Sequence, residues 1–108
     1  MTYEIVLEAL ADRTRRNVFE SLRAGALTVG ELADLQPVSR PAVSQHLRVL
    51  ETAGLVTAEA HGSRRLYSIR REGLAELRTY LDGFWSDVLG AFAAEIKLRK
   101  TKKDGNYD

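Results

Sequence analysis

The sequence predicts a small, mainly α-helical domain with one β-hairpin, in the order of four helices, two strands and a long last helix. Apolar residues recur every three or four positions along most of the chain. Capping residues and glycines mark where helices begin and end, and the helical period is lost between about residues 55 and 69. The 108 residues allow one domain. We expect it to span residues 1–97, followed by a basic, polar and disordered tail at 98–108.

The first two helices are predicted from apolar spacing and from one capping residue. Residues 3–10 carry apolar side chains at helical spacing and are expected to form a short amphipathic helix. Asp12 is suited to cap a second helix, which should end before Gly25 because glycine commonly follows a helix. The expected buried residues of this second helix are Val18, Phe19 and Leu22.

The third and fourth helices are predicted from local capping patterns. Thr28 and Glu31 have the spacing of a capping box, which opens a helix over about residues 28–34. Pro37 disfavours helical geometry at the residue before it and so separates this helix from the next. Ser39 is suited to cap a fourth helix over residues 39–53, which should stop at Gly54.

A hairpin and a long helix complete the chain. Residues 55–60 and 65–69 are expected to form two strands, joined by a turn at 61–64 that contains Gly62. From about Glu72 to Lys97, apolar residues again recur at intervals of three or four and predict the last helix.

Two short helices joined by a proline-containing link and followed by a hairpin are typical of a winged helix-turn-helix domain. In this arrangement the second helix enters the major groove of DNA. On a helix over residues 39–53, Val43, Leu47 and Leu50 share one face and are expected to pack inward. The opposite face carries polar side chains, with Arg40, Ser44 and Arg48 in line and Gln45 beside them.

The positive charge of the chain is concentrated in the same region. Residues 36–71 carry six arginines and two glutamates, a net charge of +4, whereas the whole chain has +1. Arginine suits guanine edges and phosphates, glutamine suits adenine, and serine suits phosphate. The hairpin arginines are expected to contact phosphates or the minor groove. The predicted DNA-binding residues are Thr28, Ser39, Arg40, Ser44, Gln45, His46, Arg48, Arg64 and Arg65.

The last helix carries more apolar surface than one small domain can cover. A large exposed apolar patch usually marks an interface, so we expect a homodimer. Pairing by two-fold symmetry would also place two recognition helices about one DNA turn apart. The predicted interface residues are Val6, Leu10, Leu81, Phe84, Trp85, Val88, Leu89 and Phe92.

Several stretches resemble the ArsR/SmtB family of bacterial winged-helix repressors. Residues 10–16 (LADRTRR) are similar to the family's LADPTRR opening, and residues 29–33 (VGELA) also fit. The most specific stretches are residues 38–50 (VSRPAVSQHLRVL) and 53–56 (AGLV). The resemblance covers residues 3 to about 92 and implies a dimer built from the first and last helices. It also implies repression at an operator near the protein's own promoter.

The sequence departs from the family in its metal ligands. Metal sensors of this family place cysteine pairs on the third helix, or Asp/His and His/Glu pairs on the last helix. This chain has no cysteine, and its last helix has Asp82, Asp87 and Glu95 but no histidine. His46 and His61 lie in the recognition helix and the hairpin, where phosphate contact or simple solvation is expected. We therefore predict no metal and no cofactor, and the family's derepressing signal does not carry over, which leaves the effector unknown.

Other functional classes fit less well. An enzyme would need a nucleophile, a base and an orienting group, or a metal, and Ser44 and His46 point in different directions on their helix. A winged helix that binds only proteins would have an uncharged or acidic recognition face, whereas this one carries Arg40 and Arg48. The sequence does not distinguish an activator from a repressor, and only the family resemblance favours a repressor. Without a signal peptide or a long apolar run, a cytoplasmic location is expected.

Overall fold

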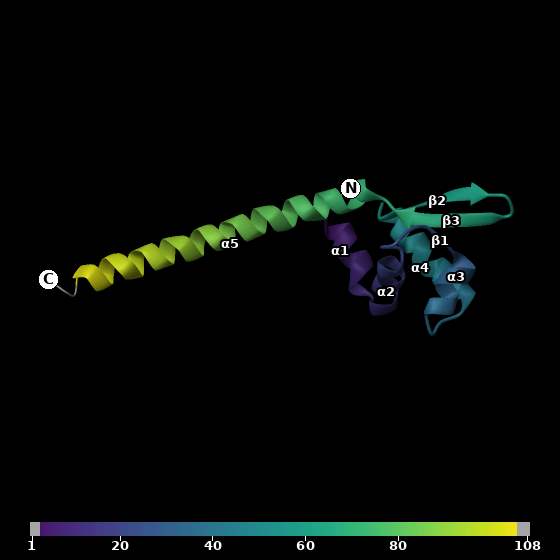
Figure 1. Cartoon of the computed structure of the whole chain (residues 1–108), viewed down its shortest axis with the longest axis horizontal. Helices are drawn as coiled ribbons and strands as arrows, with labels where there is room; N and C mark the ends of the chain where they lie inside the picture. The colour runs from purple at the N-terminus through teal and green to yellow at the C-terminus, as the bar shows by residue number, and fades with distance from the viewer. Residues whose placement is uncertain (1–2, 106–108) are drawn as a thin grey trace. The chain divides into compact units, whose positions relative to one another are not determined.

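The computed structural model describes residues 3–105 of the backbone and the side chains of residues 3–100. The chain divides after Leu77 into two compact units. The first unit contains seven complete elements and the start of the last helix (Figure 1). These elements are α1 (Tyr3–Ala11), α2 (Arg13–Ser21), β1 (Leu27–Thr28), α3 (Val29–Leu35), α4 (Arg40–Thr52), β2 (Val56–His61) and β3 (Arg64–Ile69). The last helix, α5, spans Arg71–Gly105. The predicted order of four helices, hairpin and helix is confirmed, with one additional strand.

The helix caps expected from sequence are present. The Asp12 carboxylate accepts the N–H of Arg15 at 2.8 Å, which opens α2. Thr28 and Glu31 form the reciprocal capping box of α3. The Ser39 hydroxyl oxygen accepts the N–H of Ala42 at 3.3 Å and opens α4. Local side-chain chemistry therefore positions three of the helix starts.

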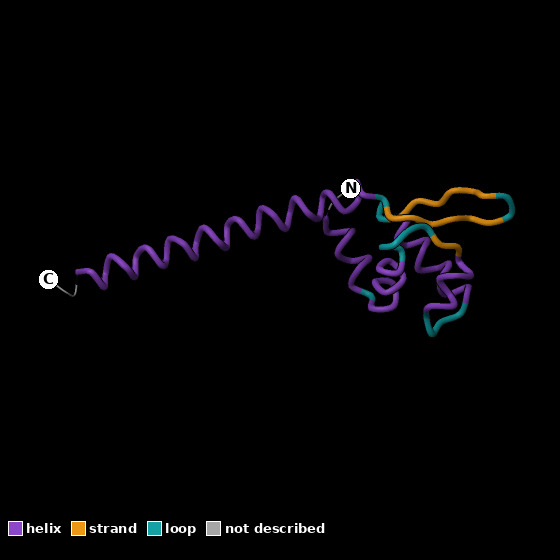
Figure 2. The backbone as a smooth tube through the Cα atoms, viewed as in Figure 1, coloured by secondary structure: helices purple, strands orange, loops and turns teal. Residues whose placement is uncertain are grey.

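The sheet has three antiparallel strands in the order β1-β3-β2 (Figure 2). In the hairpin, Val56 pairs with Ile69 and His61 pairs with Arg64. The strand β1 was not predicted from sequence, because two residues are too few to show an alternating pattern. It pairs with the middle of β3, Leu27 opposite Tyr67 and Thr28 opposite Leu66. This pairing holds the start of α3 beside the hairpin.

The core lies between the helices and the sheet of the first unit. Val18, Phe19 and Leu22 are buried as predicted, and so are Val43 and Leu47. The full set of buried apolar residues is Val6, Ala9, Val18, Phe19, Leu22, Leu32, Val43, Leu47, Leu50, Ala53, Leu55, Val56 and Tyr67. Val6, which the sequence assigned to a dimer interface, belongs to this core in the single chain and is only 1% exposed. On α1, Ile5 and Leu7 are the large apolar residues that remain exposed.

Two glycines shape the passage from α4 to the sheet and to α5. Gly54 has a φ of 77°, and the Leu55 N–H donates to the Leu50 carbonyl at 2.9 Å, as in a Schellman motif. The Arg70 N–H then donates to the Leu55 carbonyl at 2.8 Å. A Cβ on Gly73 would overlap the Gly54 carbonyl, so the first turn of α5 packs backbone to backbone against the end of α4.

The second unit contains α5 from Arg78 onward. The ion pairs Arg78–Asp82 and Arg99–Glu95 join side chains one turn apart on this helix. The helix was expected to end at Lys97, but it continues to Gly105. Leucine, arginine and lysine, which favour helices, follow Lys97, and the expected polar tail therefore begins as helix. Residues 106–108 of that tail lie outside the described residues.

The large apolar side chains of the second unit are exposed. They include Leu81, Phe84, Trp85, Val88, Leu89, Phe92, Ile96 and Leu98. Within the described part of the chain, no helix is long and apolar enough to cross a membrane.

Candidate nucleic-acid interface

The helix α4 has one buried face and one polar face. Val43, Leu47 and Leu50 are fully buried, which confirms the predicted orientation of this helix. On the other side Arg40, Gln45 and Arg48 are exposed, while Ser44 and His46 are half-buried. The polar face therefore keeps its donors and acceptors available to a ligand.

The start of α3 is fixed by the capping box and by the sheet. The Glu31 N–H donates to the Thr28 hydroxyl oxygen at 3.2 Å, and the Thr28 N–H donates to the Glu31 carboxylate at 2.9 Å. The hydrogen bonds from Thr28 hold the pKa of Glu31 below its ordinary value, and the nearby charge of Arg64 lowers this pKa further. Glu31 thus stays ionised and links the start of α3 to the hairpin by charge.

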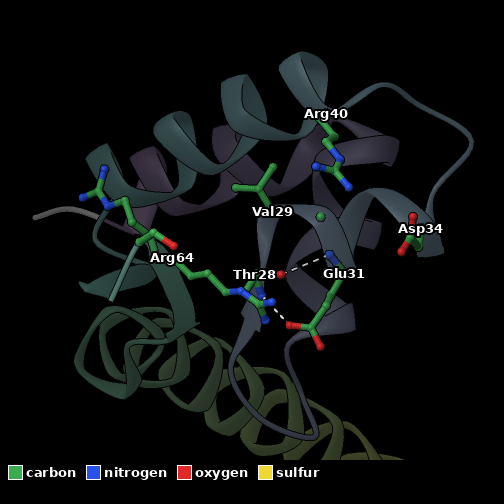
Figure 3. Close-up of a pocket in the computed structure, with 9 residues that line it drawn as sticks. Thr28, Val29, Glu31, Asp34, Arg40 and Arg64 are labelled. Atoms are coloured by element: carbon green, nitrogen blue, oxygen red, sulfur yellow. Dashed lines mark hydrogen bonds between the residues drawn. The ribbon is translucent and has the colours of Figure 1, made fainter. Parts of the chain in front are cut away.

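A pocket of 490 Å³ lies where α3, α4 and the hairpin turn meet (Figure 3). Three arginines from two different elements line it: Arg40 begins α4, and Arg64 and Arg65 begin β3. In Figure 3 the Arg64 side chain extends toward Thr28 and Glu31. Thr28 lines the same pocket, so the structure brings together four of the nine residues predicted to bind DNA. This arrangement favours a phosphate or another anion between the helix and the wing.

Five further residues of this pocket were missed as site residues in the sequence. They are Val29, Gly30, Glu31, Asp34 and Ser63. A Cβ on Gly30 would lie 3.3 Å from an Nη atom of Arg40, so this glycine lets the guanidinium rest against the first turn of α3. A glycine inside a helix costs stability and often marks such a close approach, and this was the signal available in the sequence.

The wing is a tight hairpin with its arginines at the tip. Gly62 has a φ of 64°, a left-handed conformation that suits the turn between His61 and Arg64. The guanidinium of Arg65 lies 5.9 Å from the centre of the Tyr67 ring, which is buried in the sheet. This cation–π contact supports the Arg65 side chain at the side of β3.

The remaining predicted residues of α4 do not join this pocket. Ser39 caps the helix, and Ser44 and Gln45 lie farther along its polar side. The Arg15 N–H, which donates to the Asp12 carboxylate, holds the pKa of Asp12 below its ordinary value, and His46 lies near this carboxylate. Arg48 lines a separate groove between α4 and α1. The line Arg40–Ser44–Arg48 therefore runs from the wing toward α1.

Metal ligands are not grouped in the described part of the chain. No cluster of three or more His, Cys, Asp or Glu side chains lies there in positions that could hold a metal ion. His46 and His61 are on different elements, and His61 lies 3.8 Å from the carboxylate of Glu59 in the hairpin.

Comparisons with known proteins agree with this geometry. A family model described as a helix-turn-helix domain matches residues 10–59. The chain is 57% identical over 89 residues to the HTH-type transcriptional regulator Rv2034 of Mycobacterium tuberculosis. These 89 residues cover 82% of the chain and 83% of that protein. It is 40% identical over 72 residues to the HTH-type transcriptional repressor SmtB of the same bacterium, with 67% of the chain and 53% of the relative covered.

A solved structure shows the same fold. It is the solution NMR structure of the homodimeric winged helix-turn-helix DNA-binding domain of Mb0332 from Mycobacterium bovis, a possible ArsR-family transcriptional regulator. The chain matches it with a TM-score of 0.64 and 28% sequence identity, over 81% of each chain.

Proposed function

Because this chain belongs to the ArsR/SmtB family of winged helix-turn-helix transcriptional regulators, we propose that it is a homodimeric repressor that binds a two-fold operator in duplex DNA. We further propose that the operator lies near its own promoter, so that the protein represses its own synthesis. This proposal gives the chain no catalytic role, and its place of action is the cytoplasm.

The arginine pocket at the junction of α3, α4 and the wing carries this proposal. Arg40, Arg64 and Arg65 line one pocket at the start of the recognition helix. With α4 in the major groove, this pocket would face the DNA backbone beside the groove. In each helix cap, the hydroxyl oxygen of Thr28 or Ser39 accepts a backbone N–H. The hydroxyl proton is not used in this bond and can be donated to a phosphate oxygen.

Base reading is proposed for the exposed polar side of α4. Gln45 is exposed near the start of the helix and can form a bidentate contact with adenine. Arg40, Ser44, His46 and Arg48 complete the proposed set of contacts from α4. Of these, Arg40 is placed to reach either a guanine edge or a phosphate.

The proposed dimer is supported by the exposed apolar residues of α5 and by the homodimeric relative. Trp85 is 61% exposed and Phe84 is 57% exposed, with Val88, Leu89 and Phe92 on the next turns. Leaving such side chains in water is unfavourable, and a second copy of the same helix could cover them. A two-fold dimer would present two α4 helices to successive major grooves.

Footprinting of the purified full chain on the DNA upstream of its own gene tests the proposal. We expect protection of two half-sites related by a dyad, about one helical turn apart, and increased transcription from that promoter when the gene is deleted. A single half-site, or protection without any change in transcription, would contradict the homodimeric repressor. Decreased transcription on deletion would instead identify an activator.

A further inference from the structure

A second groove, on the side of α4 toward α1, is lined by apolar residues and by two arginines. It has a volume of 410 Å³ and is formed by α1, α2 and α4 and the C-cap of α4, all in the first unit. Its apolar residues are Ile5, Ala9, Val49 and Ala53. Pockets for small molecules commonly measure about 300–1,000 Å³ and combine apolar walls with a few polar groups.

The two arginines of this groove lack acceptors within the described chain. Neither the Arg15 nor the Arg48 guanidinium forms a hydrogen bond or an ion pair with a described side chain. The Nε atom of Arg15 is also covered from solvent, although it has no hydrogen-bond partner. A charged donor that is desolvated and unsatisfied is costly, and an anion beside it would reduce this cost.

Two carboxylates, those of Glu8 and Asp12, lie near this pair of arginines. Glu8 lines the same groove and leaves a net charge of +1 with Arg15 and Arg48. Asp12 also interacts with Arg15 by charge, but it does not line the groove, and one of its carboxylate oxygens accepts the backbone N–H that opens α2. The residues that line the groove therefore combine an apolar wall with a net charge of +1.

We propose that this groove binds a small carboxylate with a hydrocarbon chain, and that its binding weakens the affinity of the protein for operator DNA. The carboxylate lies between Arg15 and Arg48, and the hydrocarbon chain lies against Ile5, Ala9 and Val49. The second effect rests on the proposed function, because Arg48 belongs to the groove and also to the polar side of α4. An occupied groove would engage Arg48 and place a negative charge beside the recognition helix.

Titration without DNA tests the groove independently of any operator. We would add sodium octanoate to the ¹⁵N-labelled full chain and follow its amide spectrum. We expect saturable shifts at residues 5–9, 15 and 48–53. Acetate has the charge without the chain and 1-octanol has the chain without the charge, so both should bind at least about tenfold more weakly.

The amide spectra also distinguish a small ligand from a second copy of the chain. If the groove is a seat for another subunit, the same amides should shift on dilution and should not respond to octanoate. That result, or equal binding of 1-octanol and octanoate, would overturn the proposal.

Single substitutions test the charges of the groove. Arg15→Gln should weaken octanoate binding about tenfold, since it removes a charged donor while keeping an amide of similar length. Glu8→Gln is the matched control and should strengthen binding, because it removes the opposing charge. Thr52→Glu adds a carboxylate at an exposed position of the groove and should weaken binding even if Arg15→Gln fails to fold. Unchanged affinity in both Arg15→Gln and Thr52→Glu would refute the site.

A DNA-binding measurement tests the regulatory step. Saturating octanoate should reduce operator affinity at least about fivefold in the wild-type protein, and Arg15→Gln should require about tenfold more octanoate for the same effect. If octanoate saturates the groove but leaves operator affinity unchanged, the regulatory part of the proposal is wrong. If the protein binds no operator at all, the proposed function fails while the titration without DNA still decides the groove.

Discussion

Several polar residues at the starts of α3 and α4 already have a structural role. The hydrogen-bond donors that they retain determine which contacts they can make with DNA. The oxygens of Thr28 and Ser39 accept backbone N–H groups, which leaves their hydroxyl protons for an outside acceptor. Arg40 rests against Gly30, so its guanidinium approaches a ligand from a restricted position. Gln45 is exposed, so its side-chain amide can turn to form hydrogen bonds with a base edge in the major groove.

Substitution of the α4 side chains tests base recognition. Arg40→Ala and Gln45→Ala should each cost about 1–3 kcal/mol of binding free energy on the cognate operator and should relax sequence preference. Arg23→Ala is the matched control, because Arg23 is exposed and lines neither pocket. Gel-shift titration measures the affinities. Wild-type affinity in both α4 variants would mean that this helix does not read the operator.

Substitution of the capping residues tests their contribution to folding. Thr28→Ala and Ser39→Ala should each lower the free energy of unfolding by about 1 kcal/mol, since each leaves a helix N–H without its acceptor. Urea denaturation at one fixed protein concentration measures the change, because dimerisation would make stability depend on concentration. Thr52→Ala, at an exposed position without a capping role, should be neutral or slightly stabilising. A loss of the same size in Thr52→Ala would show that the effect is unrelated to capping.

At the scale of elements, the short strand β1 connects the start of α3 to the hairpin formed by β2 and β3. It pairs with β3 and ends at the capping residue of α3. The wing arginines and the start of α3 are therefore held by one continuous set of hydrogen bonds and by the charge of Glu31. This pairing therefore places the strand that carries Arg64 and Arg65 beside the start of α3.

The wing should act through the DNA backbone rather than through base identity. The double variant Arg64→Ala/Arg65→Ala should weaken binding to cognate and unrelated DNA by similar factors. The slope of log affinity against log salt should become shallower by about 0.9 for each phosphate contact that is lost. Affinities measured at several salt concentrations check this. An unchanged slope, or a loss confined to the cognate site, would remove the wing from the phosphate contacts.

The elements that could be predicted from sequence are those with a local cause. The caps at Asp12, Thr28 and Ser39 and the glycines at the turns depend on neighbours within a few residues. The strand β1 depends on pairing with residues about forty positions away, and the sequence shows no sign of it. The end of α5 was also misplaced, because helix-forming polar residues continue after the apolar pattern stops.

At the scale of the whole molecule, the grouping of side chains depends on how the helices pack. Helical spacing placed Arg40 and Arg48 in one line, but packing assigns Arg40 to the wing pocket and Arg48 to the groove beside α1. Spacing likewise could not decide which apolar side of α1 faces the core. It led to Val6 as an interface residue, whereas Val6 is buried and Ile5 and Leu7 are exposed. Burial separates apolar residues that stabilise the chain from those available to a partner.

The exposed apolar residues of α5 lead to a prediction about assembly. Burying one aromatic side chain contributes roughly 1.5–3 kcal/mol, so several from each subunit can exceed the entropy cost of association. Trp85→Glu places a charge among Leu81, Phe84, Val88 and Leu89 and should shift the protein from dimer to monomer. Operator affinity should fall when the dimer is lost, because two linked α4 helices bind two half-sites more tightly than one helix binds one half-site.

Analytical ultracentrifugation at micromolar concentration checks the assembly, and the same samples can be used for operator binding. Asp87→Asn, on the same helix and outside the apolar set, is the matched control and should remain a dimer. Circular dichroism should show that Trp85→Glu keeps its helices, because the core of the first unit does not contain this residue. A wild-type chain that sediments as a monomer and still binds its operator tightly would refute both the dimer and the two-fold operator. In that case the apolar residues of α5 would need a partner other than a second copy.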